Sequence, residues 1–83
     1  MDLRAQIKEK LIKRGAPLFG KKPEEITEEM KFVKDLNAKS VHYSQITTYL
    51  EDEFDVEIPF MTFRRKETIG EAIDYVLDLV ESE

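Results

Sequence analysis

The chain contains no cysteine and no tryptophan, and it has only three glycines, three prolines and one histidine in 83 residues. Without cysteine there can be no disulfide, no thiolate-bound metal and no cysteine nucleophile, and a reducing compartment is permitted. Residues 1–15 are interrupted by charge every two or three positions, so they lack the apolar core of a signal peptide and are too polar to span a bilayer. We therefore expect a cytoplasmic protein.

The composition is that of a small soluble domain. Charged residues make up 37% of the chain and apolar residues 41%, and the formal net charge is −5. An acidic protein is poorly suited to nonspecific binding of nucleic acid, which needs a positive face. A chain of this length forms one domain, here residues 1–83, and buries only about 60% of the surface of its unfolded state.

Residues suited to catalysis are few. The one histidine, His42, lies about 200° around a helix from Ser40, so the two cannot form a nucleophile and base pair within that helix. The carboxylates of residues 51–57 lack the spacing and central glycine of a calcium loop, and no glycine-rich phosphate loop is present. We expect no metal site and no enzymatic activity.

The hydrophobic periodicity predicts an all-α fold, a small four-helix bundle with three main helices, one short helix and a long first loop. The main helices are predicted at residues 2–14, about 40–55 and 68–81, with a turn or two of helix within residues 60–66. Residues 15–39 are expected to be a connection pinned to the core by apolar side chains, among them Phe32 and Val33.

Local signals mark the ends of these helices. Asp2 is the predicted N-cap of the first helix, and Gly15 is its predicted stop signal. Thr68 and Glu71 are predicted to form a capping box at the start of the last helix. On local physics alone, Ser40 is the N-cap of the second helix, with its hydroxyl accepting from an amide two or three residues later.

The second helix has two faces when its residues are placed at 100° intervals. The predicted core side consists of Tyr43, Ile46, Thr47, Leu50 and Phe54. A separate stripe faces away from it, formed by Val41, Gln45, Thr48 and Asp52. An exposed valine beside Ser40 indicates a recognition surface, although single exposed apolar residues are common.

A short basic segment stands between two acidic ones. Residues 60–66 contain three basic residues, Arg64, Arg65 and Lys66, whereas residues 40–59 and 67–83 contain none. One interpretation is ion pairing with Asp52, Glu53 or Glu57 on a solvated surface. The alternative is a patch that faces a partner.

Four segments occur in an order and spacing that resemble an acyl carrier protein: PEEIT at 23–27, DLNAKSV at 35–41, LEDEFDVEIP at 50–59 and TIGEAIDYV at 68–76. The resemblance covers nearly the whole chain. It implies a bundle of acyl-carrier type and a covalent phosphopantetheine on Ser40, which makes the chain a phosphoprotein. Such a carrier holds an acyl group as a thioester and presents it to separate enzymes without catalysing a reaction itself.

The resemblance also implies partners and an acyl pocket. The partners are a phosphopantetheinyl transferase and acyl-loading, condensing or transferring enzymes, which act on a monomeric carrier. The expected partner-contact residues are Lys39, Val41, His42, Gln45, Thr48, Asp52, Arg64 and Arg65. The expected pocket residues are Ile46, Leu50, Phe54, Met61, Phe63 and Ile73.

The sequence departs from the family pattern around the serine. Lys39-Ser40-Val41 stands where family members usually have Asp-Ser-Leu, and Asn37 stands at a usual glycine. We therefore expect a specialised carrier of a dedicated pathway in lipid metabolism rather than of bulk fatty acid biosynthesis. One alternative is an aminoacyl or peptidyl carrier, which the polar Ser44 and Thr47 favour. Another is a carrier-like interaction module without a prosthetic group, in which Ser40 is only a cap.

Overall fold

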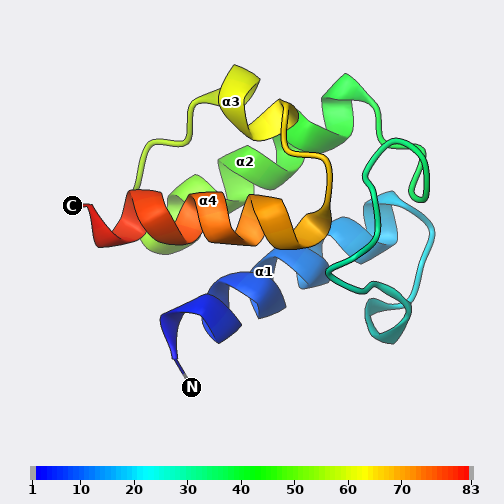
Figure 1. Ribbon diagram of the computed structural model, residues 1–83, viewed down its shortest axis with the longest axis horizontal. Helices are drawn as coiled ribbons and strands as arrows, with labels where there is room; N and C mark the ends of the chain where they lie inside the picture. Colours follow the sequence, from blue (N-terminus) through cyan, green and yellow to red (C-terminus); the bar gives the residue numbers. More distant parts are fainter. Residues whose placement is uncertain (1, 83) are drawn as a thin grey trace.

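The computed structural model describes residues 2–82, and its regular elements are helices. Over these residues the α-helices are α1 (Leu3–Leu18), α2 (Ser40–Phe54), α3 (Phe60–Arg64) and α4 (Ile69–Glu81), and a 3₁₀ turn, η1, covers Pro23–Glu25. Helix α1 packs against both α2 and α4, and α3 packs against α2 (Figure 1). The prediction of a small helical bundle with three main helices and one short helix is confirmed.

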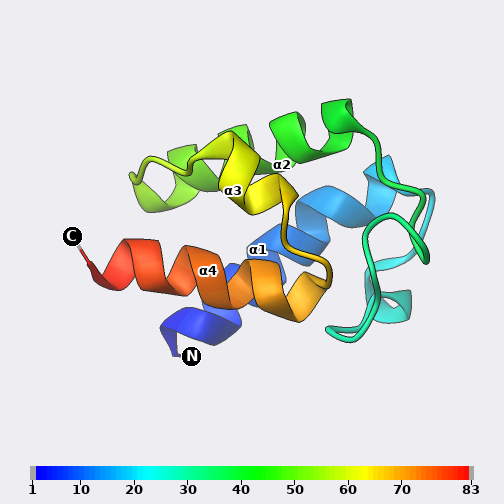
Figure 2. The same cartoon turned by 45° about the horizontal axis from the view of Figure 1, so that its top comes forward.

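The core lies between the three long helices and is closed at one end by aromatic side chains. Phe32 from the first loop, Tyr43 from α2 and Phe63 from α3 are buried, with ring centroids 5.2–6.3 Å apart in tilted or edge-on pairs. Figure 2 shows α3 lying alongside α2, in front of it in this view. These rings therefore join the loop, α2 and α3 near the beginning of α2.

Helix α1 begins as predicted but ends later. Asp2 Oδ1 accepts a hydrogen bond from the Ala5 amide at 2.7 Å, which confirms this N-cap. Gly15, the predicted stop, lies inside the helix, and a Cβ added there would be 3.3 Å from the Phe19 ring and 3.6 Å from Ile46. The missing side chain thus permits close packing of α1 on α2, and the prediction of a stop was wrong.

The actual end of α1 uses Gly20. This residue has a φ of 69°, and the Lys21 and Gly20 amides donate to the carbonyls of Ala16 and Pro17 at 2.9 and 3.3 Å. Two such bonds around a left-handed glycine form a Schellman motif. Pro17 is accommodated inside the last turn of the helix.

The long first loop is pinned by apolar side chains, as predicted. Ile26, Phe32, Leu36 and Ala38 are buried. Val33, however, is 67% exposed, so its expected role in pinning the loop was wrong.

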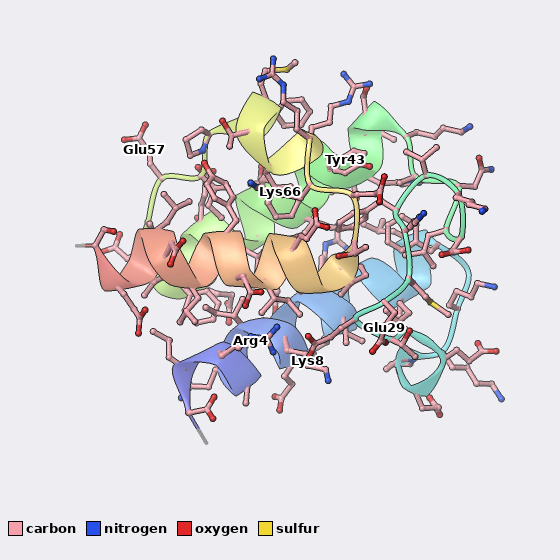
Figure 3. All side chains as sticks on the ribbon, viewed as in Figure 1. Arg4, Lys8, Glu29, Tyr43, Glu57 and Lys66 are labelled. Carbon is pink, nitrogen blue, oxygen red and sulfur yellow. The ribbon has the colours of Figure 1, made fainter. Side chains whose placement is uncertain are left out.

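A polar cluster ties the same loop to two helices. Arg4 of α1 donates to both carboxylate oxygens of Glu28, at 2.7 and 3.0 Å, and also to Asp74 of α4 at 2.8 Å. Lys8 lies 3.1 Å from Glu28 and points to the same side of α1 (Figure 3). The Glu28 carbonyl accepts from the Gly70 amide at 2.9 Å, so this part of the loop is fixed to both α1 and α4.

Helix α4 starts at the predicted cap with one difference. Thr68 Oγ1 accepts from the Glu71 amide at 3.1 Å, which is half of the predicted capping box. The Glu71 carboxylate accepts from the amide of Glu67 rather than from that of Thr68. The reciprocal bond is thus shifted by one residue. Thr68 also forms an antiparallel bridge with Lys31 of the first loop.

Candidate functional site

Ser40 is the first residue of α2, and its hydroxyl does not cap the helix. The N-cap position is occupied by Lys39, whose backbone is extended and whose carbonyl accepts from the His42 amide at 2.9 Å. The prediction that Ser40 is the N-cap was wrong. The Ser40 side chain is exposed and has no hydrogen-bond partner within residues 2–82.

His42 provides a side-chain hydrogen bond at the start of α2, to a different amide from the one that Ser40 was expected to bind. Its Nδ1 accepts a hydrogen bond from the Lys39 amide at 3.0 Å, and its ring packs edge-on against Phe19 with centroids 5.1 Å apart. His42 is partly buried and is therefore not a freely exposed partner-contact residue. A side chain at this third helical position normally serves this purpose as Glu or Gln.

The loop before Ser40 is shaped by Asn37 and Lys39. Asn37 has a φ of 53°, a left-handed conformation that asparagine tolerates better than most residues other than glycine. Its Oδ1 accepts from Lys39 Nζ at 3.1 Å. Asparagine can therefore serve at this position without a glycine, and the Lys39 ammonium is held on the Asn37 side of the loop.

Two backbone amides at the start of α2 are open. The N–H groups of Ser40 and Val41 have no hydrogen-bond acceptor among the described residues. The N–H groups of Lys39 and His42 do have one, because each donates to the other residue. Free amides and the positive end of the helix dipole favour an anion here. The beginning of α2 therefore combines an exposed hydroxyl with groups that stabilise a negative charge attached to it.

A basic pocket lies one helical turn further along α2. It has a volume of about 370 Å³ and is formed by the first loop, Tyr43 of α2, the end of α3 and the segment that leads to α4. Its lining residues are Lys31, Val33, Lys34, Tyr43, Arg64, Arg65, Lys66 and Glu67. We call this cavity the basic pocket, and Figure 3 shows two of its residues, Tyr43 and Lys66, on one side of the bundle.

The basic residues at the end of α3, Arg64 to Lys66, do not form the local ion pairs that one interpretation expected. Neither arginine forms an ion pair with a carboxylate in the described part of the chain, and Glu53 is paired instead with Lys10 of α1 at 2.9 Å. Arg64 and Arg65 are both exposed. The interpretation of local pairing with Asp52, Glu53 or Glu57 was therefore wrong.

Tyr43 is the least exposed residue that lines the basic pocket. Its side chain is only 3% exposed, and burial raises the pKa of its phenol, while the charge of Arg64 opposes that shift. The hydroxyl makes no hydrogen bond within residues 2–82. It is not fully buried, so solvent reaches it. Only the tip of Tyr43 therefore reaches the solvent in the pocket.

The predicted acyl-pocket residues fall into two groups. Ile46, Leu50, Phe63 and Ile73 are fully buried and lie in one apolar cluster, and Phe54 packs partly buried against it. Met61 is 54% exposed on α3, so its expected place in the interior was wrong. The side chains of the apolar cluster are fully buried and closely packed. An acyl chain could therefore enter the cluster only if these side chains moved.

The predicted partner-contact stripe on α2 is mostly exposed. Val41 is 54% exposed, and Thr48 and Asp52 also face solvent. Gln45 is different, because its side-chain oxygen accepts from Arg14 of α1 at 2.9 Å and its side chain is only partly exposed. The placement of Gln45 on a freely exposed stripe was therefore wrong.

Sequence reasoning missed the contribution of Lys31, Lys34 and Tyr43 to the basic pocket. The first loop was read as a connection and Tyr43 as a core residue, so their meeting with Arg64 was not foreseen. The net positive charge of residues 1–39 indicated a basic surface. Where these charges lie in the structure depends on how the first loop folds back onto α3.

A search against models of known protein families finds none that matches this chain. Within residues 2–82 no helix has both the length and the apolar character needed to cross a membrane.

Proposed function

We propose that this protein is a specialised acyl carrier that receives a phosphopantetheine group on Ser40. The carrier holds an acyl group and delivers it to separate enzymes of a dedicated pathway in fatty acid or lipid metabolism. We further propose that it acts as a cytoplasmic monomer and is not itself an enzyme. The resemblance of four ordered sequence segments to this family leads to the proposal.

The observation that carries the proposal is the state of the Ser40 hydroxyl. It is exposed at the beginning of a 15-residue helix and is left free because His42 and Lys39 cap the helix instead. The simplest structural role of this serine, an N-cap, is thereby removed. A transferase can reach such a hydroxyl without breaking a bond that holds the fold.

The residues around Ser40 fit the attached group. Its phosphodiester would lie at the positive end of α2, where the open amides of Ser40 and Val41 can donate to it. The group supplies a thiol that carries the acyl chain, a chemistry that a chain without cysteine cannot provide. Lys39 adds a positive charge beside the phosphodiester, in place of the acidic residue usual in the family.

Intact mass measurement tests this proposal. The unmodified protein is incubated with coenzyme A and a promiscuous phosphopantetheinyl transferase, in parallel with Ser40→Ala and Ser44→Ala. Ser44 is a matched control because it is a second exposed serine on the same helix. We expect the mass of one phosphopantetheine on the wild type and on Ser44→Ala and none on Ser40→Ala.

Failure of every transferase on the wild type would favour an interaction module without the arm. The aminoacyl carrier alternative has lost part of its support, since Thr47 is buried and its hydroxyl donates to the Ser44 carbonyl at 3.1 Å. That hydroxyl is used within α2 and is not offered to a polar cargo. Identification of the native thioester would separate these two carriers.

A further inference from the structure

The basic pocket concentrates positive charge in a protein whose net charge is −5. Five of its eight lining residues are lysine or arginine, and one, Glu67, is acidic. Glu67 lies 3.8 Å from Lys31, at the long end of ion-pair distances. Lys66 is placed over the ring of Tyr75 at 4.9 Å.

The other three cations of the pocket, Lys34, Arg64 and Arg65, have no carboxylate partner within residues 2–82. Cations held around one cavity repel each other, so an anion bound between them would remove an unfavourable interaction. The tip of Tyr43 adds a hydroxyl that can donate a hydrogen bond into the same space.

The position of the pocket relates it to Ser40. Tyr43 follows Ser40 by one helical turn, and side chains three positions apart on a helix share a face with Cβ atoms about 5–6 Å apart. The apolar core beside the pocket is filled by fully buried side chains such as Phe63 and Ile46. An extended phosphopantetheine arm is longer than this separation, so the arm must fold back along α2 for its acyl group to reach the basic pocket. The pocket lies on the surface and, unlike the interior, can receive the group without a rearrangement of the core.

We propose that the basic pocket binds the terminal carboxylate of an acyl group carried on Ser40, so that the preferred cargo is a short dicarboxylic acyl group. This inference rests on the proposed function for the attachment at Ser40. The guanidinium groups of Arg64 and Arg65 match a carboxylate in shape and charge, and Lys34 and the Tyr43 hydroxyl complete the site. Val33, which lines the pocket, gives the methylene chain an apolar contact.

The pocket can be tested first on the unmodified chain. Glutarate, its neutral analogue glutaramide and inorganic phosphate are titrated separately while the amide and arginine side-chain NMR signals are followed. We expect saturable shifts at Tyr43, Arg64 and Arg65 with glutarate and none with glutaramide. Equal shifts with glutaramide, no shifts with glutarate, or tighter binding of phosphate than of glutarate would overturn the carboxylate assignment.

Matched variants locate the binding. Lys34→Gln and Arg64→Gln should each weaken glutarate binding about twofold to fivefold, the range expected when one exposed charge pair is lost. Lys21→Gln removes the same charge from an exposed residue outside the pocket and should leave the affinity unchanged. A loss of the same size in Lys21→Gln would show only a general effect of charge and would overturn the site.

The loaded protein then tests the source of the carboxylate. Ser40 is modified with an unloaded arm, a glutaryl arm or a pentanoyl arm, and the pocket signals are compared. Shifts with the glutaryl arm alone support the proposal. Shifts that already appear with the unloaded arm, or none with the glutaryl arm on a fully modified protein, overturn it without affecting the proposed function. If Ser40 accepts no arm, the proposed function fails and so does this cargo, whatever glutarate does on the unmodified chain.

Discussion

The imidazole Nδ1 of His42 accepts a hydrogen bond from the backbone amide of Lys39 at 3.0 Å. The same His42 ring contacts Phe19, which follows the last residue of α1. One side chain therefore caps α2 and also holds the end of α1 against it. This arrangement leaves the adjacent Ser40 hydroxyl without a structural task, which is the condition for a modification that does not disturb the fold.

Loss of the His42 acceptor should weaken α2. His42→Ala removes the bond to the Lys39 amide together with the contact to Phe19, and we expect a decrease of about 1 kcal/mol in the free energy of unfolding. Urea denaturation measures this decrease. His42→Gln is the control, because glutamine at the same position keeps a carbonyl acceptor and should recover part of the stability. An equal loss in both variants would assign the effect to the Phe19 contact alone.

Removal of the Ser40 hydroxyl should have little effect on the unmodified fold. Ser40→Ala breaks no hydrogen bond within the described residues, so the free energy of unfolding should change by less than about 0.5 kcal/mol, as for most surface substitutions. Loss of a true N-cap costs about 1 kcal/mol instead. A loss of that size in denaturant unfolding would return Ser40 to the role of a cap.

The cluster around Glu28 should make stability depend on acid pH. The hydrogen bond from Arg4, together with that from Lys8, lowers the pKa of Glu28 to about 2 from its ordinary value of 4.5. The group therefore contributes stability above about pH 4.5, and the contribution is lost as the pH falls toward 2. We expect Glu28→Gln to be less stable than the wild type near neutral pH and the difference to shrink across this interval.

Thermal unfolding between pH 2 and pH 7 checks the sign of this change. Glu29→Gln is the matched control, since it removes the same charge from the neighbouring residue, which forms no ion pair with Arg4. A pH-dependent difference of equal size in Glu29→Gln would show that general charge, rather than the Arg4 contact, is responsible.

The sequence predicts helix starts well where a short polar side chain stands just before an apolar periodic segment. Asp2 and Thr68 both accept amide hydrogen bonds as expected, because the geometry of such a cap is set within three residues. The prediction of a helix end at Gly15 was wrong because this glycine serves tertiary packing and does not end the helix. Its missing side chain accommodates Phe19 and Ile46, and the second of these lies on another helix.

The candidate site was predictable only in part for the same reason. Ser40 was identified from the pattern of the whole chain, but the capping role of His42 depends on Phe19, which the sequence places 23 positions away. The basic pocket needs Lys31 and Lys34 of the first loop to lie beside Arg64 of α3. Such meetings depend on the path of the first loop, which is fixed by buried residues such as Phe32 and not by any local signal.

The last prediction concerns the enzymes that the proposed carrier meets. Lys39, Arg64 and Arg65 are exposed, and Lys39 stands where carriers of the resembled family usually have aspartate. The two arginines have no carboxylate partner within residues 2–82. A partner that docks with lysines and arginines would face like charges, which slow encounter and oppose docking. An enzyme with an acidic rim should be favoured instead.

Charge reversal tests this preference. Lys39→Asp and the double variant Arg64→Glu, Arg65→Glu are loaded chemically with the same neutral acyl group, so that neither modification nor the charge of the cargo differs between them. Turnover by a standard fatty-acid condensing enzyme should rise in both, and the rise should be larger at low salt because the Debye length is about 8 Å at physiological ionic strength. Lys39 lies outside the basic pocket, so its variant separates docking from any effect of that pocket. Wild-type turnover already equal to that of a housekeeping carrier would show that these three charges do not govern the choice of partner.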